Sequence, residues 1–194
     1  MSSNAEALAL SAEIKTLALG SAPTANLFTI AAAESLTVGR VQTLLGLVSG
    51  SSEYFLGGAT AYSPEQKEKL FGVPLSESQP CAGVSESIAR QLASGARQRF
   101  GADIAVATTG FAEPAPEYGA AHPMAWWSVA WKASVSSTAP GAPRIPHVIG
   151  DPENGYTLAA CVEFPGHTRA EAQEATALAA ATALRNLLRS LRAQ

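Results

Sequence analysis

Residues 26–63, NLFTIAAAESLTVGRVQTLLGLVSGSSEYFLGGATAYS, decide the fold class of this 194-residue chain. Residues 26–34 form a continuous apolar run, which is typical of a strand buried on both faces. Residues 37–48 have the pattern of a helix, SGSS makes a turn, and residues 54–62 form a second strand. A strand, a helix and a second strand in this order indicate an α/β fold.

The same alternation continues through the rest of the chain. Helices are expected over residues 5–19, 63–71, 84–100 and 169–192, and further strands over residues 102–110, 125–135 and 156–164. The last helix begins with Thr168 and Glu171 spaced as a capping box. The pattern predicts a single domain over residues 1–194, an α/β/α sandwich of three layers with a mixed, mostly parallel sheet.

Two segments interrupt the alternation. Residues 111–123, FAEPAPEYGAAHP, follow the third strand, and residues 136–155, SSTAPGAPRIPHVIGDPENG, join the last two strands. The second segment is polar and holds four of the twelve prolines, so it is unsuited to a core. We expect residues 136–155 to be an exposed loop excursion rather than a domain.

Composition and charge exclude several classes of function. The net charge of −3 and the absence of a basic stripe argue against a nucleic-acid partner. No apolar run is long enough to cross a membrane. The two cysteines, Cys81 and Cys161, lack metal-ligand spacing, and the three histidines lie far apart, so we expect neither a metal nor a cofactor. The N-terminus has no charged signal region, so a reduced, cytoplasmic protein is expected.

Polar side chains follow the first three predicted strands. They are Glu34, Ser35 and Thr37 after the first strand, Tyr62 and Lys67 after the second, and Thr108 and Thr109 at the end of the third. Ligands in open α/β sheets sit at the carboxyl ends of strands, so these side chains are expected to line one cleft. Amide groups opening the helices near Thr37 and Pro64 are candidates for binding a phosphate.

The spacing of Tyr62 and Lys67 suggests a catalytic role. With Ser63 as the N-cap of its helix, Tyr62 and Lys67 take positions that meet across the first turn. A lysine held in the cleft, partly desolvated and near a positive helix end, has a lowered pKa and can act as a base toward a serine. A tyrosine can relay the proton. The alternative is that Tyr62 packs against the fold while Lys67 is solvated.

Three stretches resemble a known family. Residues 32–73, AAESLTVGRVQTLLGLVSGSSEYFLGGATAYSPEQKEKLFGV, are similar to the family pattern AESCTGG followed by GSSxxFxGGxxxYSNxxKxxLLGV. Residues 82–114 and 163–180 are similar to the segments that follow. The order and spacing resemble the C-terminal domain of CinA, the family of PncC-type nicotinamide-mononucleotide amidohydrolases, from about residue 28 to 190.

The resemblance implies an activity and a set of site residues. Such a domain is an α/β/α sandwich that tends to dimerise and, where active, removes ammonia from nicotinamide mononucleotide without a metal. The partners implied are a small nucleotide or amide substrate and a second copy of the chain. The catalytic positions correspond to Ser35, Tyr62 and Lys67, and the nucleophile is either Ser35 or one of Ser51 and Ser52. The substrate-binding candidates are Glu34, Thr37, Gly39, Ser51, Ser52, Thr108, Thr109, Gly110 and Arg169.

Departures from the family pattern define a second hypothesis. Val38 and Glu113 replace glycines, Ala125 and Trp126 replace a Gly-Thr pair, and the family's arginines after the last strand are missing, with Arg169 as a substitute for one of them. A carboxylate at Glu113 would repel a phosphate, and Trp126 could fill the pocket. The chain is therefore expected to be either an amidohydrolase or a non-enzymatic relative that binds or regulates.

Overall fold

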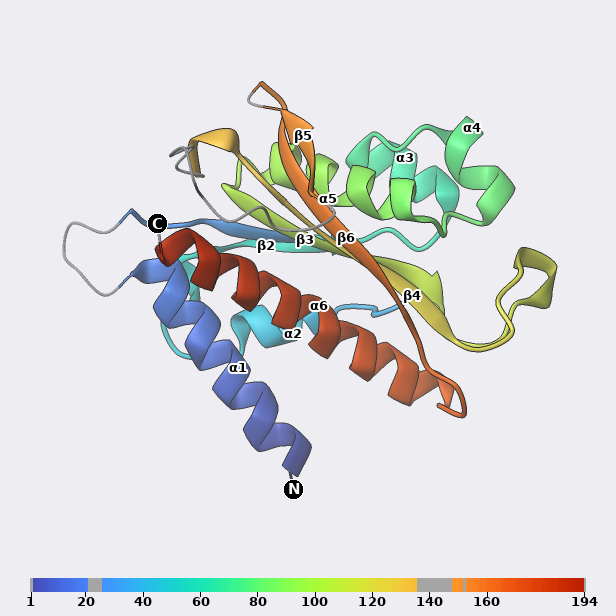
Figure 1. Ribbon diagram of the computed structural model, residues 1–194, viewed down its shortest axis with the longest axis horizontal. Coiled ribbons are helices and arrows are strands. Elements are labelled where there is room, and N and C mark those ends of the chain that lie inside the picture. Colours follow the sequence, from blue (N-terminus) through green and yellow to red (C-terminus); the bar gives the residue numbers. More distant parts are fainter. Residues whose placement is uncertain (1, 21–25, 136–147, 152, 194) are drawn as a thin grey trace.

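The computed structural model describes residues 2–20, 26–135, 148–151 and 153–193 (Figure 1). Its centre is a sheet that has, within these residues, six strands in the order β2-β1-β3-β4-β6-β5. The strands are β1 (Ile30–Glu34), β2 (Phe55–Thr60), β3 (Ile104–Phe111), β4 (Met124–Trp131), β5 (Val148–Asp151) and β6 (Gly155–Glu163). Helices cover both faces of the sheet, so the expected three-layer α/β/α fold is confirmed (Figure 1).

The pairing of the strands is less parallel than expected. Strand β1 pairs in parallel with β2 and β3, whereas the pairs β3–β4, β4–β6 and β6–β5 are antiparallel. The reason lies between β3 and β4, where residues 112–123 contain no helix longer than the short 3₁₀ turn Pro116–Tyr118. A parallel return would require a longer crossover, usually a helix, so β4 runs back beside β3 instead.

One face of the sheet packs against α1 (Ser2–Leu19), α2 (Arg40–Gly46) and α6 (Arg169–Arg192). Helix α6 has the predicted bounds, and Thr168 and Glu171 form the predicted capping box at its start. The core on this side joins alternate strand residues such as Ile30, Ile104 and Val106 to leucines of α6. Complete burial of each such side chain contributes roughly 1.5–3 kcal/mol to stability.

The opposite face packs against α5 (Glu86–Phe100), with α3 (Pro64–Phe71) beside it, and the short α4 (Leu75–Ser78) contacts α3. Alanines of β1 and β3 face α5, and small side chains let the helix approach the sheet closely. Helix α3 rests on α5 at Gly95, where a Cβ atom would lie only 2.1 Å from the carbonyl oxygen of Phe71. This close packing fixes the position of α3 relative to the end of β1.

Part of residues 136–155 belongs to the sheet, which corrects the expectation of a loop excursion. Strand β5 pairs antiparallel with β6, with Val148 opposite Leu158, and forms one edge of the sheet. Ile149 on this edge is 59% exposed. The surrounding prolines and polar residues concealed a strand whose apolar signal is only Val148 and Ile149. Residues 136–147 of the expected excursion lie outside the described residues.

A helix that spans a membrane must be long and apolar. In the part of the chain that the structure describes, no helix combines the length and the apolar character that a membrane span requires.

Candidate active site

A pocket of about 310 Å³ lies at the carboxyl ends of β1, β2 and β3. Ser35 directly follows β1, Tyr62 follows β2, and Gly110 belongs to the end of β3. The parallel strands therefore bring three distant segments together at their carboxyl ends. The start of α6 closes the pocket with Arg169. The predicted location of the site, at the strand ends, therefore coincides with a pocket of suitable size for a small molecule.

Ser35 and Lys67 are in direct contact. The ammonium of Lys67 donates to the hydroxyl of Ser35 over 2.9 Å and to the carbonyl oxygen of Ala61 over 3.2 Å. Lys67 is 1% exposed and Ser35 is 6% exposed. Burial lowers the pKa of Lys67 from 10.5 to about 8, and the nearby Cys81 opposes this effect to a smaller degree. A lysine with this pKa can accept the proton of a serine at mildly alkaline pH.

Lys67 is buried by a neighbouring loop in which Gly83 is required. The aliphatic part of Lys67 runs across Gly83, where a Cβ atom would lie 2.9 Å from Cε of the lysine. Gly83 also has a φ of +74°, a conformation that favours glycine. The hydroxyl of Thr109 donates to the carbonyl oxygen of Gly83 over 2.6 Å. Thr109 thus holds the loop that covers Lys67, and it is not among the residues that line the pocket.

Glu34 serves a structural purpose. Its buried carboxylate accepts hydrogen bonds from the amides of Gly39, Val41 and Gln42 and from the hydroxyl of Thr37. The carboxylate therefore occupies the anion site at the start of α2 that the sequence suggested for a phosphate, and this corrects the prediction for Glu34 and Gly39. The expectation of a ligand at these amides is wrong because the chain supplies its own anion.

Thr37 and Thr108 are likewise engaged inside the fold. Their hydroxyl groups lie 2.7 Å apart, and both side chains are fully buried. Together with Glu34 they form a chain of hydrogen bonds behind the pocket, which links the end of β1 to β3. The two threonines hold the end of β1, from which Ser35 projects, and neither lines the pocket.

Tyr62 and Arg169 form the opposite, exposed side of the pocket. A guanidinium nitrogen of Arg169 donates to the hydroxyl of Tyr62 over 2.6 Å, and another pairs with the carboxylate of Glu113 over 2.7 Å. Tyr62 is 55% exposed, and Lys67 reaches only its main-chain carbonyl, at 3.5 Å. The expected contact between the two side chains is therefore replaced by a contact of Tyr62 with Arg169.

Ser51 and Ser52 do not belong to this site. They lie in a 3₁₀ turn that precedes β2, whereas Ser35 follows β1. Because β1 and β2 are parallel, these positions lie at opposite ends of the strands. The separation along the strand is roughly 20 Å at about 3.3 Å per residue. Within one chain this topology separates Ser51 and Ser52 from the Ser35 pocket, contrary to the prediction that they belong to it.

Gly110 lies at the pocket as predicted, whereas Trp126 does not fill it. Gly110 lines the pocket, and a Cβ atom there would lie 2.3 Å from the carbonyl oxygen of Met124 on β4, so close strand packing explains the glycine. Trp126 does not fill the pocket, because it pairs with Thr109 on the face toward α5 and lines a neighbouring cavity. Trp127 faces the opposite side, against α6, as the alternation of a strand predicts.

Sequence reasoning missed the residues that shape the surroundings of Ser35 and Lys67. Ala82, Gly83 and Val84 belong to the stretch of residues 82–114 that resembles the family pattern, but the pattern assigned them no role, and the structure brings this segment against Lys67 of α3. The glycine at position 83 is the local signal that could have pointed to the close approach. Among the described residues no group of three or more His, Cys, Asp and Glu side chains is arranged to hold a metal ion.

The comparisons with known proteins agree with this architecture. The competence damage-inducible protein A (ComA) of Klebsiella pneumoniae has a TM-score of 0.73 at 22% identity, over 94% of this chain and 97% of that chain. The competence/damage inducible protein CihA of Agrobacterium tumefaciens has a TM-score of 0.71 at 24% identity, over 95% and 96%. At these identities the likeness supports the fold alone.

The sequence relatives cover a shorter stretch. A CinA-like protein of Picosynechococcus sp. is 43% identical over 103 residues, which are 53% of this chain and 24% of that protein. A CinA-like protein of Mycobacterium avium is 49% identical over 85 residues, which are 44% of this chain and 20% of that protein. The matched stretches thus span about a quarter or less of these relatives. The family model described as the CinA C-terminal domain matches residues 14–139, and this chain belongs to that family.

Proposed function

We propose that this chain is a Ser–Lys amidohydrolase that releases ammonia from nicotinamide mononucleotide or a closely related small carboxamide. The observation that carries the proposal is the buried contact of 2.9 Å between Ser35 and a Lys67 whose pKa is lowered to about 8. At pH 7 about one lysine in ten with such a pKa is neutral and able to accept a proton. The substrate follows from the family resemblance and not from the geometry.

The reaction would proceed in two halves. Neutral Lys67 takes the proton of Ser35 while the hydroxyl oxygen attacks the amide carbon, and the tetrahedral intermediate collapses as Lys67 returns that proton to the leaving nitrogen. Ammonia departs and an ester on Ser35 remains. Water, deprotonated by Lys67, then attacks the ester, and the carboxylic acid leaves as the Ser35 hydroxyl is restored. No further proton donor is required for the balance.

Arg169 and Tyr62 would hold the phosphate of the substrate. Both line the same pocket as Ser35, and the guanidinium of Arg169 is the charge that suits a phosphate. In the free protein Arg169 is already paired with Glu113, so a phosphate has to compete with that carboxylate. We therefore expect weak binding of the mononucleotide by the unmodified chain.

The ammonia released from nicotinamide mononucleotide by purified protein tests the proposal. We expect turnover by the wild type and none above background in Ser35→Ala or Lys67→Ala. Turnover should be unchanged in Ser51→Ala, the matched control at the opposite end of the strands. Turnover that persists in Ser35→Ala would rule out this serine as the nucleophile.

The pair of Glu113 and Arg169 favours a second candidate function, a relative without catalytic activity that binds a ligand or regulates a partner. A wild type that binds nicotinamide mononucleotide without releasing ammonia would support it. We also propose, from the family resemblance, that the chain acts as a homodimer, which sedimentation at several protein concentrations tests.

A further inference from the structure

A second cavity of about 340 Å³ adjoins the Ser35 pocket. The two cavities share Val84 and Phe111 in their walls. The second cavity extends from the Ser35 pocket toward β4 and β6. Its other walls come from residues 118–122, from Trp126, from Glu163 at the end of β6 and from the start of α5. Nothing in the proposed amide hydrolysis at Ser35 uses this space.

The cavity is lined by aromatic rings that are incompletely covered. Phe111 and Tyr118 stack with ring centres 5.3 Å apart and an angle of 14° between their planes. Tyr118 is 48% exposed, and Trp126 is half-buried. The stacked pair covers one face of each of its rings, which leaves the exposed part of Tyr118 and the half-buried Trp126 for a flat ligand. Stacking of a base on an aromatic side chain contributes about 1–3 kcal/mol.

The charges in the cavity oppose an anionic ligand. Glu86, which is paired with Arg90, and Glu163 contribute carboxylates, His122 also lines the cavity, and the described lining residues include neither lysine nor arginine. Glu163 disfavours a phosphate, while amino groups and other N–H donors would find acceptors in both carboxylates. The second cavity therefore differs in kind from the Ser35 pocket, where Arg169 supplies a positive charge.

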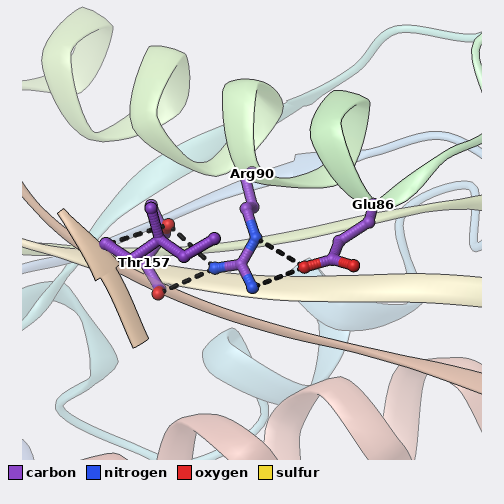
Figure 2. Close-up of polar contacts among 4 residues, drawn as sticks. Glu86, Arg90 and Thr157 are labelled. Carbon is purple, nitrogen blue, oxygen red and sulfur yellow. Dashed lines mark hydrogen bonds and ion pairs between the residues drawn. The ribbon is translucent and has the colours of Figure 1, made fainter. Parts of the chain in front are cut away.

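Glu86 is held in a defined position by a buried arginine. Two nitrogens of Arg90 donate to the same oxygen of Glu86 over 3.0 and 2.6 Å, and a third nitrogen donates to the carbonyl and hydroxyl oxygens of Thr157 over 2.8 and 3.0 Å. Figure 2 shows the second oxygen of Glu86 pointing away from Arg90. Arg90 is 9% exposed, so α5 and β6 together fix this carboxylate at the cavity.

We propose that the cavity around Trp126 is a second subsite that binds a planar nitrogen heterocycle with amino donors, such as an adenine base. The aromatic faces hold the ring, and the carboxylates accept its N–H groups. Combined with the proposed amidase, on which this extension rests, the substrate class becomes an amide-bearing nucleotide joined to a second nucleoside. The subsite itself does not depend on that activity.

Calorimetry with adenosine, which carries the ring but no phosphate and no carboxamide, tests the subsite. We expect wild-type protein to bind adenosine, and Trp126→Ala and Tyr118→Ala to bind it roughly tenfold more weakly or worse, as the loss of one stacking partner implies. Trp127→Phe, which changes the neighbouring residue on the opposite face, should bind as the wild type does. Tyr118 lies on an exposed turn, so this variant remains informative even where Trp126→Ala does not fold.

The proposal is overturned if wild-type protein does not bind adenosine, or if both variants bind it with wild-type affinity. Loss of binding in Trp127→Phe as well would place the contact elsewhere and would also overturn it. Because ammonia release from nicotinamide mononucleotide requires Ser35 and Lys67 and not the second cavity, that assay fails or succeeds independently of this one.

Discussion

The ammonium of Lys67 donates to the hydroxyl of Ser35 across 2.9 Å, and both side chains are almost completely removed from solvent. The two residues are 32 positions apart in the sequence. A cation in such a position is disfavoured by the loss of its hydration, so the pair is set up for the lysine to lose its proton. The chemical consequences of this relationship can be measured.

The activity should depend on pH through Lys67. The neutral form is the base, so kcat/KM should rise about tenfold per pH unit below the pKa of about 8 and become constant above it. Ammonia release between pH 6 and pH 9.5 measures this profile. A rate that does not change across this range would show that Lys67 is not the base.

Replacement of Lys67 by arginine should abolish activity as completely as replacement by alanine. Arginine keeps the positive charge but cannot give up its proton in a protein. Turnover of Lys67→Arg and Lys67→Ala under the same conditions gives the comparison. Activity near that of the wild type in Lys67→Arg would mean that charge alone is required, and the Ser–Lys mechanism would be abandoned.

The burial of Lys67 should also cost stability at neutral pH. Its pKa is about 8 in the folded protein and 10.5 in the unfolded chain, so the unfolded state binds more protons between these values and stability rises with pH across that window. Below pH 8 the full penalty applies, about 3 kcal/mol. In Lys67→Met this penalty disappears, but the hydrogen bonds to Ser35 and Ala61 are lost as well.

We therefore expect Lys67→Met to be about 1–2 kcal/mol more stable than the wild type at pH 7 and about 1–2 kcal/mol less stable near pH 10.5, where the burial penalty is gone and only the loss of the hydrogen bonds remains. Denaturant unfolding at both pH values gives the two differences. A variant that is less stable than the wild type at pH 7 would show that the lysine contributes more through its contacts than its burial costs.

Glu113→Gln should strengthen the binding of nicotinamide mononucleotide. The substitution removes the carboxylate that pairs with Arg169 at 2.7 Å and leaves the guanidinium available to the phosphate. The pair is exposed, so we expect a gain of several-fold, which corresponds to about 1 kcal/mol. Calorimetry measures the affinity, and Glu117→Gln on the same loop is the control for the change in net charge. An equal gain in both variants would attribute the effect to overall charge.

Val38→Asn should raise the melting temperature. Val38 has a φ of +49° and is 50% exposed, so a β-branched residue occupies a left-handed conformation without much burial to compensate for it. Asparagine tolerates this conformation better, and relief of the strain is worth about 1 kcal/mol, or about 2–4 °C in a domain of this size. Thermal unfolding followed by circular dichroism measures the shift, with Leu47→Asn, an exposed apolar residue whose φ of −68° is unstrained, as a control. An unchanged or lower melting temperature in Val38→Asn would contradict the strain.

The sequence by itself determined the alternation of elements and the limits of the last helix. The apolar run that ends at Glu34 and the capping residues Thr168 and Glu171 act on their immediate neighbours, so their effect can be read locally. The strand ends also predicted where a cleft would lie, because the residues that follow parallel strands lie together at the carboxyl ends of those strands. Ser35 and Lys67 were identified in this way together with the family pattern.

The tertiary structure alone decided what each polar residue does. Glu34 caps α2 and Thr109 holds Gly83, because the amides and the carbonyl that they contact are brought to them by folding. The pairing of β4 with β3 directs Trp126 into a neighbouring cavity and away from the Ser35 pocket. A pattern of residue types records which groups are present, whereas burial and hydrogen bonding depend on segments that are distant in the sequence and meet only in the folded chain.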